Sequence, residues 1–529
     1  MGIKRYISDA DTTITNAFES NLVTRGTGSN MGESDVTEVF SIYGQASGST
    51  GYSPELSRAL YKFPTSTISS DRTAGTIPAT GSVQFYLNLY NAKHAFTLPR
   101  SYTLVISAVS QAWEEGHGLD MEGYSDLTND GVGTNWIYAS EGTTWGTIGG
   151  NFHDSPVYVA TFDRGHEDLS VDITGLVEEW MAGTKSNYGL AIYLTSSQES
   201  YFSSSTGANT SELLHNTAGA QKSYYTKKFF ARGTEFFFKR PCIEARWDST
   251  DKDDRGNFFY SSSLSSGEDN LNTIYLYNVV RGQLQNIPDV GTGAIYVSLY
   301  SGSLDNSSPT GSALQLVSDL HNVSSANNQV VTGGYIETGI YTASFALTAA
   351  ASGQDDALTR LFDVWWKGDA DAAAGVGTQF HTGTISPTTL DSLNIANTPR
   401  YTTKITNLKD SYADQENVRF RVYTRDRNWN PNIYKVASRD VENLIVEDAY
   451  YKILRVTDAV DVIEYGTGSS PGATGSASDY TRLSFDVSGS YFDLDMTLLE
   501  SGYAYGVKFV YFVNGKYLEQ PETFKFRVE

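Results

Sequence analysis

The chain has 529 residues, of which 13% are aromatic, and it contains 48 glycines and 35 tyrosines. Its 61 acidic and 38 basic side chains give a formal charge of −23, which argues against nucleic acid and anionic membrane as direct partners, since both repel a negative surface. The single cysteine, Cys242, excludes an internal disulfide and a cysteine-based metal cluster. The length predicts about three domains, and the composition predicts an all-β, multi-domain fold of tandem β-sandwiches.

The N-terminal segment lacks the apolar core of a secretion signal, and no run of about 18 apolar residues occurs in the sequence. We therefore expect the protein to fold in a reducing cytoplasm. An extracellular destination would then require another exit, such as release of a finished particle.

Residues 1–247 alternate as strands and turns. Every second residue of 83–89 is apolar, and so is every second residue of 104–108, which predicts two half-buried strands of a sandwich. The acidic, Gly-rich stretch from Trp113 to Trp136 has no period and predicts a loop. A last strand after Pro241 closes the region, and the charged, turn-rich residues that follow Trp247 predict a domain boundary.

One short helix is expected within this β-rich region. Leu176, Val177 and Trp180 fall at positions i, i+1 and i+4, which places them on one apolar face of a very short helix, about one turn long. The helix is followed by the apolar run Leu190-Ala191-Ile192.

Residues 248–398 predict a second β-sandwich domain. Its strands are expected at residues 273–280, 294–301, 341–347 and 359–366, separated by Ser-, Asn- and Gly-rich connectors.

Residues 399–529 predict an immunoglobulin-like sandwich. Val418, Phe420 and Val422 alternate with polar residues, and Asn514-Gly515 lies between two apolar runs. Asn-Gly in that setting predicts a β-hairpin, because its tight turn requires positive φ at both central residues. We expect this hairpin, Val510 to Leu518, to supply one contact with a partner.

Several motifs of the first region resemble the DNRLRE family of jelly-roll-like β-sandwich modules. The resemblance implies that Trp180 plugs one side of the sandwich and that Asn187-Tyr188-Gly189 turns into a core strand. The motifs are SRALYKFPTSTI (57–68), SVQFYLNLY (82–90), Trp113-Glu114-Glu115, the stretch 171–194, and Glu235 with Arg240-Pro241-Cys242-Ile243.

A looser resemblance covers most of the chain. It is to large structural proteins of marine tailed bacteriophages, and it implies a virion component without transferring any catalytic residue. The segments that carry it are YSDLTNDG (124–131), VRFRVYTRDRNWNPNIY (418–434) and YAYGVKFVYFVNGKYLEQPETFKFRV (503–528).

Two motifs resemble a hydrolase nucleophile and a calcium-binding loop, but neither has the residues or the neighbouring elements that such a site requires. Gly468–Gly472 matches the G-x-S-x-G pattern around Ser470, but a flexible Gly/Ser-rich run follows it where a hydrolase needs a helix. Asp251–Gly256 starts like a calcium-binding EF-hand loop, yet Arg255 stands at position five and Ser262 where a bidentate Glu is required.

The acidic loop leaves two interpretations open. Its carboxylates could hold a structural calcium ion, although a solvated loop is the favoured interpretation. As a glycosidase pair, two adjacent carboxylates are unsuitable because neighbouring strand residues point to opposite faces. The acidic residues of the loop are Glu114, Glu115, Asp120, Glu122, Asp126 and Asp130.

The seven histidines, at positions 94, 117, 153, 166, 215, 321 and 381, show no metal-ligand spacing. No catalytic, cofactor-binding or metal-binding residue is therefore assigned, no cofactor is implied, and no enzymatic activity is expected. Exposed aromatics remain as candidates for stacking on sugars or for packing on a neighbouring subunit, at Asn135–Tyr138 and at Ser223–Tyr225.

The leading hypothesis is a non-enzymatic bacteriophage virion protein: a connector, fibre or decoration component at the neck or tail. Its expected partners are portal, neck, tail or capsid subunits, and it is expected to be a homo-oligomer within a symmetric particle. The alternative is a glycan- or receptor-binding adhesion module of a phage tail or cell surface, with a host surface glycan as partner.

Overall fold

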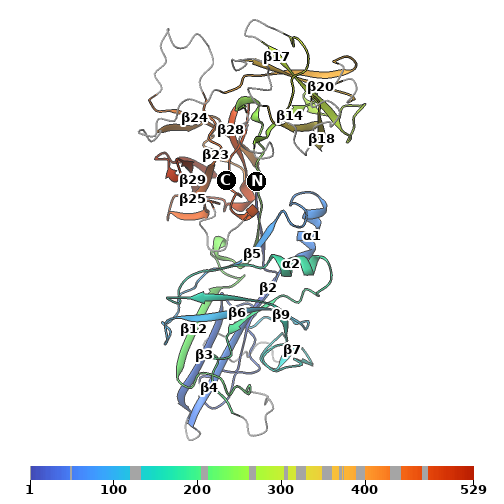
Figure 1. The fold of residues 1–529 in the computed structure, drawn as a ribbon. Helices are drawn as coiled ribbons and strands as arrows, with labels where there is room; N and C mark the ends of the chain where they lie inside the picture. The colour runs from blue at the N-terminus through green and yellow to red at the C-terminus, as the bar shows by residue number, and fades with distance from the viewer. Residues whose placement is uncertain are drawn as a thin grey trace. The chain divides into compact units, whose positions relative to one another are not determined.

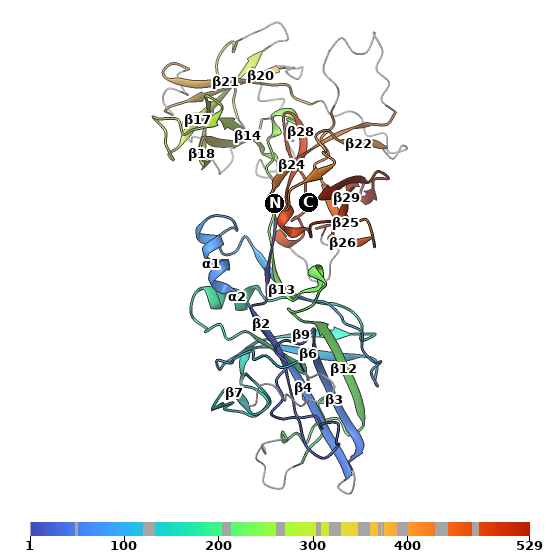
Figure 2. The ribbon, with the colours of Figure 1, turned by 180° about the vertical axis from the view of Figure 1, so that it is seen from behind.

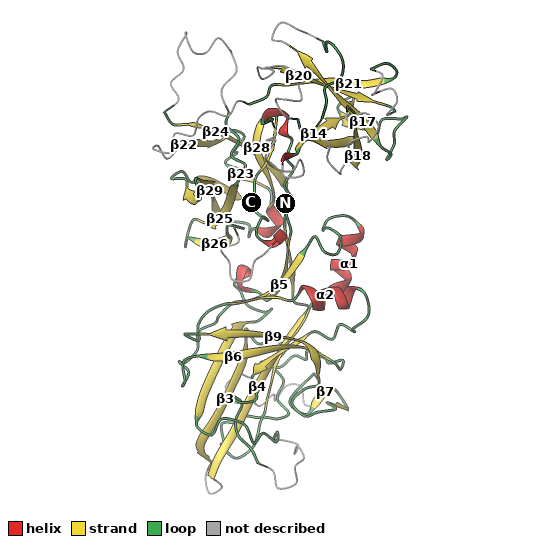
Figure 3. Ribbon diagram, viewed as in Figure 1, coloured by secondary structure: helices red, strands yellow, loops and turns green. Residues whose placement is uncertain are grey.

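The computed structural model describes the chain except residues 1, 48–50, 120–132, 204–212, 261–269, 303–307, 317–328, 348–359, 369–371, 373–374, 389–399, 429–442 and 468–474; for 44–47, 51–53 and 476 it describes the backbone alone. Strands dominate every described region, which confirms the all-β, multi-sandwich expectation (Figure 3).

Two compact units make up the fold. One comprises Gly2–Asp248 together with Gly466–Thr481, and the other comprises Ser249–Tyr465 with Arg482–Glu529 and Met1. The division after Asp248 lies one residue beyond the expected boundary. The assignment of Gly466–Thr481 to the N-terminal unit was not anticipated from the sequence. The expected division at residue 398 lies outside the described residues, so the three-domain arrangement stays a prediction.

The N-terminal unit is built on two antiparallel sheets. Figures 1 and 2 show β12, β3 and β4 as long neighbouring strands of the larger sheet. The smaller sheet has the order β1 (Ile3–Ile7), β13 (Cys242–Arg246), β5 (Gln84–Leu89), β10 (Leu169–Asp172). The larger has the order β12 (Ser223–Phe230), β3 (Val36–Ser47), β4 (Gly51–Lys62), β11 (Leu190–Leu194), β6 (Tyr102–Val109), β9 (Phe152–Phe162), with β2 (Ala10–Thr15) paired to β4.

The core lies between these two sheets, as the alternation predicts. Phe85 and Leu87 of β5 and Ile106 of β6 are fully buried in one cluster, together with Ile243 and Ala245 of β13. Sequence alternation therefore identified the inward face of β5 and β6 correctly.

A second apolar cluster covers the outer face of the larger sheet. The excursion between β6 and β9 contains the small hairpin of β7 (Tyr138–Ser140) and β8 (Thr143–Thr144). It packs Trp136 and Trp145 against residues of β4 and β11. The larger sheet is thus buried on both faces over part of its area.

The expected short helix is α2, Thr174–Met181. Leu176, Val177 and Trp180 are its buried residues, and all three belong to the cluster between the sheets, so the plug interpretation of Trp180 is confirmed. A second helix, α1 (Thr65–Thr73), was not predicted. Arg72 of α1 donates to both carboxylate oxygens of Glu178 of α2, at 2.7 and 2.6 Å.

The turn after α2 explains the Asn-x-Gly motif. Gly189 has φ +87, and a Cβ there would lie 2.0 Å from the carbonyl oxygen of Tyr61. The Asn187 side chain donates to Phe63 O and accepts from Gly189 N. Only glycine fits this approach to β4 without a shift.

The middle part of the second unit forms an antiparallel six-stranded sheet. All four expected strand segments contribute to it. Trp365 lies in the cluster on one face and Trp366 in the cluster on the other, so both faces are covered. The strand order is β14 (Asn272–Tyr277), β19 (Ile340–Phe345), β18 (Val331–Glu337), β17 (Ile295–Gly302), β20 (Arg360–Trp366), β21 (Gln379–Ile385); β15 (Val279–Val280) pairs with β16 (Gln283–Leu284).

The C-terminal part has two sheets with immunoglobulin-like features. The short β23 (Ser411–Tyr412) pairs in parallel with the last strand, β31 (Phe524–Val528). The Tyr505 hydroxyl near the start of β29 (Ala504–Val513) donates to Glu500 O at 2.7 Å, which resembles the tyrosine corner of such domains. One sheet is β22 (Tyr401–Ile405), β24 (Asn417–Asp426), β28 (Gly489–Asp495), β27 (Ser484–Asp486); the other is β23, β31, β29, β25 (Ala449–Arg455), β26 (Val460–Ile463), with β30 (Lys516–Glu519) on β29.

The Asn514-Gly515 hairpin is confirmed. Both residues have positive φ, 51 and 76, as the tight turn requires. Val510 and Tyr511 are buried in the sheet, whereas Phe512 and Tyr517 are 38% and 46% exposed and face each other at 4.8 Å between ring centroids. Of the hairpin's aromatic side chains, this pair is therefore the one available to a partner, and deleting Val510 to Leu518 would break the domain itself.

Candidate functional site: a polar clamp at the base of the acidic loop

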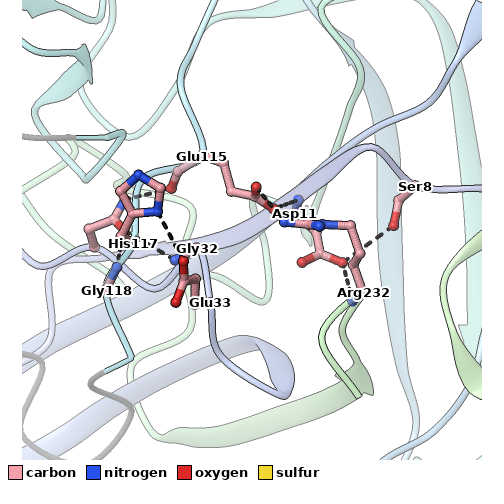
Figure 4. A network of polar contacts seen from close by, with 9 residues as sticks. Ser8, Asp11, Gly32, Glu33, Glu115, His117, Gly118 and Arg232 are labelled. Carbon is pink, nitrogen blue, oxygen red and sulfur yellow. Dashed lines mark hydrogen bonds and ion pairs between the residues drawn. The ribbon is translucent and has the colours of Figure 1, made fainter. Parts of the chain in front are cut away.

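A network of polar contacts lies at the base of the acidic loop (Figure 4). It joins four segments: the start of β2, residues 30–33, residues 114–118, and the residues just after β12. We call it the loop-base network. It decides what the acidic loop can do, because it fixes both ends of the loop.

Asn30 clamps the two ends of the loop together. Its side-chain amide donates to Glu115 O at 2.8 Å and to Thr134 O at 2.9 Å, one on each side of the loop. Its side-chain oxygen accepts from Gly32 N and Gly118 N. Four polar contacts thus satisfy one buried asparagine, as burial of an amide requires.

Two glycines make this close approach sterically feasible. Gly116 and Gly133 both have positive φ. A Cβ on Gly116 would lie 2.3 Å from the Asn30 amide, and a Cβ on Gly133 would lie 2.4 Å from the Gly116 Cα. The segments that enter and leave the loop can therefore pass this close to each other only because both residues are glycine.

Beside the clamp, two carboxylates share one arginine. Glu115 forms a two-point pair with Arg232, at 2.6 Å to Nη2 and 3.2 Å to Nε, and also accepts from Asp11 N at 2.7 Å. Asp11, 1% exposed, accepts from Arg232 N at 2.6 Å and from the Ser8 hydroxyl at 3.5 Å. Burial raises the pKa of Asp11 to about 7, opposed by the Arg232 backbone N–H. A network of this kind holds the loop base and responds to pH.

The outer side of the network is exposed. His117 Nδ1 lies 3.0 Å from a Glu33 oxygen, and both side chains are more than half exposed. Glu114 points to solvent, while Glu115 points to Arg232. The adjacent carboxylates therefore diverge, as expected for neighbouring extended residues.

This geometry reduces the number of loop carboxylates that could bind a calcium ion. The Glu115 carboxylate is occupied by Arg232 and Asp11 N, so it is not a free ligand. The remaining candidates Asp120, Glu122, Asp126 and Asp130 lie outside the described residues. In the described part of the chain, no group of three or more His, Cys, Asp or Glu side chains is placed to hold a metal ion.

Two of the four aromatic candidates for sugar stacking are buried, so the expectation that they are exposed is wrong for those two. Trp136 is fully buried and Tyr225 is 7% exposed. Trp136 is covered because its segment folds back over the larger sheet, a long-range contact that alternation does not reveal. Tyr138, 39% exposed, and the half-buried Tyr224 remain accessible.

The EF-hand-like segment is used for structure. Asp253 Oδ1 accepts from Arg255 N at 3.1 Å, Asp254 Oδ2 accepts from Thr273 N at 2.6 Å, and the Arg255 guanidinium pairs with buried Asp363. Burial raises the pKa of Asp253 to about 6 and that of Asp254 to about 7. Ser470 of the G-x-S-x-G motif lies outside the described residues.

Cys242, the lone thiol, is buried in β13, and burial raises its pKa to about 12. A thiol in that state is a poor nucleophile. Of the helices in the described ranges, none is both long and apolar enough to cross a membrane.

An exposed turn between β2 and β3 was missed by sequence reasoning. Leu22 has a left-handed backbone, φ 54, and is 70% exposed, while Val23 is 81% exposed. The Asn21 side-chain oxygen accepts from Val23 N and Thr24 N, both at 2.8 Å. The turn therefore holds two apolar side chains in solvent at the cost of a strained residue. A single Asn before two apolar residues gives no sequence signal of this.

Comparisons with known proteins give little. No family model matches the chain, and no curated protein matches it. Among solved structures, a crystal structure of trypsin-activated alpha-2-macroglobulin from Escherichia coli matches with 11% identity and a TM-score of 0.14, over 83% of this chain and 29% of that one. The chain thus spans less than a third of that structure's length, and a similarity this low carries no argument.

Proposed function

We propose that the chain is a structural protein of a tailed-bacteriophage virion, which works by binding other particle proteins at the neck or tail rather than by catalysis. The phage assignment rests on the resemblance of its sequence segments. The protein-binding role is supported by the way its polar and apolar groups are used.

The observation that carries the binding role is the Leu22-Val23 turn. Backbone strain costs on the order of 1 to 3 kcal/mol, and exposed apolar surface adds nothing to the stability of the isolated chain. Such a turn adds favourable free energy only when a binding partner covers its apolar side chains. We propose that Leu22 and Val23 insert into an apolar recess of a neighbouring virion protein, with the Phe512–Tyr517 pair as a further contact.

Charged groups support a binding role as well. Several buried charges of the described residues are paired within the chain, as in Arg5–Glu244–Arg246 and Arg58–Glu199. These pairs brace strands against one another and face no open site. The buried ion pairs thus make the sheets rigid, and a rigid sheet can present its turns to a partner in a fixed position.

The experiment compares particle incorporation. The variant Leu22→Ser/Val23→Ser should fold and stay soluble but fall at least about tenfold in purified virions, since two buried apolar side chains contribute on the order of 2 to 3 kcal/mol. The matched control is Val279→Ser/Val280→Ser, which alters another exposed apolar pair. Quantitative mass spectrometry of particles gives the copy ratio. Absence of the unaltered protein from virions would refute the proposal.

Glycan binding remains the second candidate, now on a smaller surface. With Trp136 buried, Tyr138 and Tyr224 are the side chains of the two candidate segments left to stack on a sugar ring. Selective binding of the isolated protein to a host polysaccharide, lost in Tyr138→Ala, would favour this function over the structural one.

A further inference from the structure

A lysine lies inside the N-terminal sandwich. On the inward face of β12, Lys227 stands between Tyr225 and Phe229, and it is 0% exposed. Its ammonium lies 4.6 Å from the centre of the Phe162 ring and 5.1 Å from that of Phe229. A fully buried lysine between aromatic rings is rare, because burying its charge is costly.

Oxygen atoms surround its amino group. Nζ lies 2.7 Å from Asn91 Oδ1, 2.6 Å from Glu167 O and 3.2 Å from Gly165 O. Burial lowers the pKa of Lys227 to about 8, although the carboxylates of Asp168 and Glu167 oppose this. About a tenth of the amine is therefore in the neutral, nucleophilic form at pH 7.

Asn91 is held in place as the partner. Its backbone forms an antiparallel bridge with Phe229, two residues from Lys227 on the same strand. Its N–H donates to Asp168 Oδ1 at 2.6 Å. These contacts hold the Asn91 backbone beside β12, where its side-chain oxygen lies 2.7 Å from the amine.

A histidine faces the same amide. His94 Nε2 lies 3.0 Å from Asn91 Oδ1, and Nδ1 lies 2.7 Å from Ala95 O. Burial lowers the pKa of His94, so the ring carries one proton. A ring with one proton can donate to only one of these two oxygens, and the shorter contact, to Ala95 O, places that proton on Nδ1.

We propose that Lys227 and Asn91 form an intramolecular isopeptide bond. The lone pair of neutral Nζ attacks Asn91 Cγ, and an Nζ–Cγ bond forms. The Cγ–Nδ2 bond then breaks, and Nδ2 leaves as ammonia after taking one proton from Nζ. The products are a secondary amide and ammonia, with no oxidation or reduction. Asp168 acts as a positioning residue through the Asn91 backbone.

The bond would join β12 to the segment that follows β5, between residues 136 positions apart. A cross-link over that length removes many conformations from the unfolded chain, as a disulfide does. It would do so without cysteine, and it would suit a particle protein under mechanical load. That use rests on the proposed function, but the bond itself does not.

The intact mass of the purified full-length protein tests the proposal. We expect it to be lower than the sequence mass by one molecule of ammonia, and we expect proteolysis to yield a branched peptide that joins the Lys227 and Asn91 segments. Lys227→Arg and Asn91→Ala should each restore the full mass of their sequences. Lys228→Arg, the matched control on the adjacent, half-buried lysine, should keep the deficit.

Asn514-Gly515 provides a second control, because succinimide formation at an Asn-Gly bond also releases ammonia. The variant Asn514→Gly keeps the positive φ of that turn and removes this reaction. The mass deficit should persist in it. A full sequence mass for the unaltered protein, or a deficit that vanishes in Asn514→Gly, would overturn the proposal, and neither result would bear on incorporation into virions.

Discussion

Arg58 and Glu199 form a buried ion pair across 141 residues of sequence, with contacts of 2.8, 3.0 and 3.1 Å between guanidinium nitrogens and carboxylate oxygens. The guanidinium also donates to Gly149 O and lies 5.6 Å from the centre of the Trp136 ring. The pair thus ties β4 to the segment after β11 and to the excursion that buries Trp136. Removing one partner leaves a buried charge unpaired.

Glu199→Gln should lower the free energy of unfolding of the N-terminal unit by about 3 to 5 kcal/mol, because Arg58 keeps its charge and loses its counter-ion. Urea denaturation followed by tryptophan fluorescence measures this. The control is Glu33→Gln, whose carboxylate is exposed and pairs with His117, and it should change stability by less than about 0.5 kcal/mol. Equal effects of the two variants would contradict the structural role.

Trp180→Ala should lower the free energy of unfolding by about 3 to 5 kcal/mol, since it removes a large side chain from the core between the sheets. The exposed Phe96, 80% accessible, serves as the comparison, and Phe96→Ala should leave stability nearly unchanged. A small effect of the Trp180 variant in the same denaturation assay would mean that the indole is not a plug.

Asn30→Ala should loosen the base of the acidic loop. The variant loses four polar contacts and leaves two backbone carbonyls and two N–H groups without them, which should cost about 2 to 4 kcal/mol. Hydrogen exchange should rise at residues 114–118 and 133–134 and stay unchanged in β5. Unaltered exchange at those residues would show that the glycine packing alone closes the loop.

Asp11 should make the N-terminal unit less stable as the pH rises. Its pKa is raised in the folded state to about 7, against about 3.9 when unfolded. Between those values the folded chain binds more protons, so stability is greatest below about pH 4 and falls until about pH 7. The variant Asp11→Asn should remove this dependence, and its gain in stability over the unaltered protein should grow from pH 4 to pH 8 towards a ceiling of about 4 kcal/mol. A gain that does not vary with pH would refute the shift.

Local patterns predicted the elements of the fold well. Alternation identified the inward residues of β5, β6 and β24, and the preference of Asn-Gly for positive φ identified the Asn514-Gly515 hairpin. These features depend on neighbours within a few residues. The helix α1 was missed because its sequence, rich in Ser and Thr, has a weak apolar pattern and is held by Arg72–Glu178 and by packing on α2.

The candidate sites could not be predicted in the same way. Asn30 meets residues about 85 and 104 positions away, and Lys227 meets Asn91 136 positions away. Nothing near either residue in the sequence marks it. Trp136 was interpreted as exposed for the same reason, since its burial depends on a fold-back over a sheet that local periodicity does not describe.

The segment Gly466–Thr481 belongs to the N-terminal unit, where Ala477 N donates to Gln84 Oε1 at 3.0 Å and the Tyr480 ring lies 5.2 Å from the Arg246 guanidinium. During synthesis, these groups leave the ribosome long after the strands that they cover. The first unit to emerge is thus among the last to be completed, and a nascent or truncated chain that stops short of residue 466 exposes Gln84 and Arg246 on an unfinished surface. A chain truncated before residue 466 therefore lacks part of its own N-terminal unit.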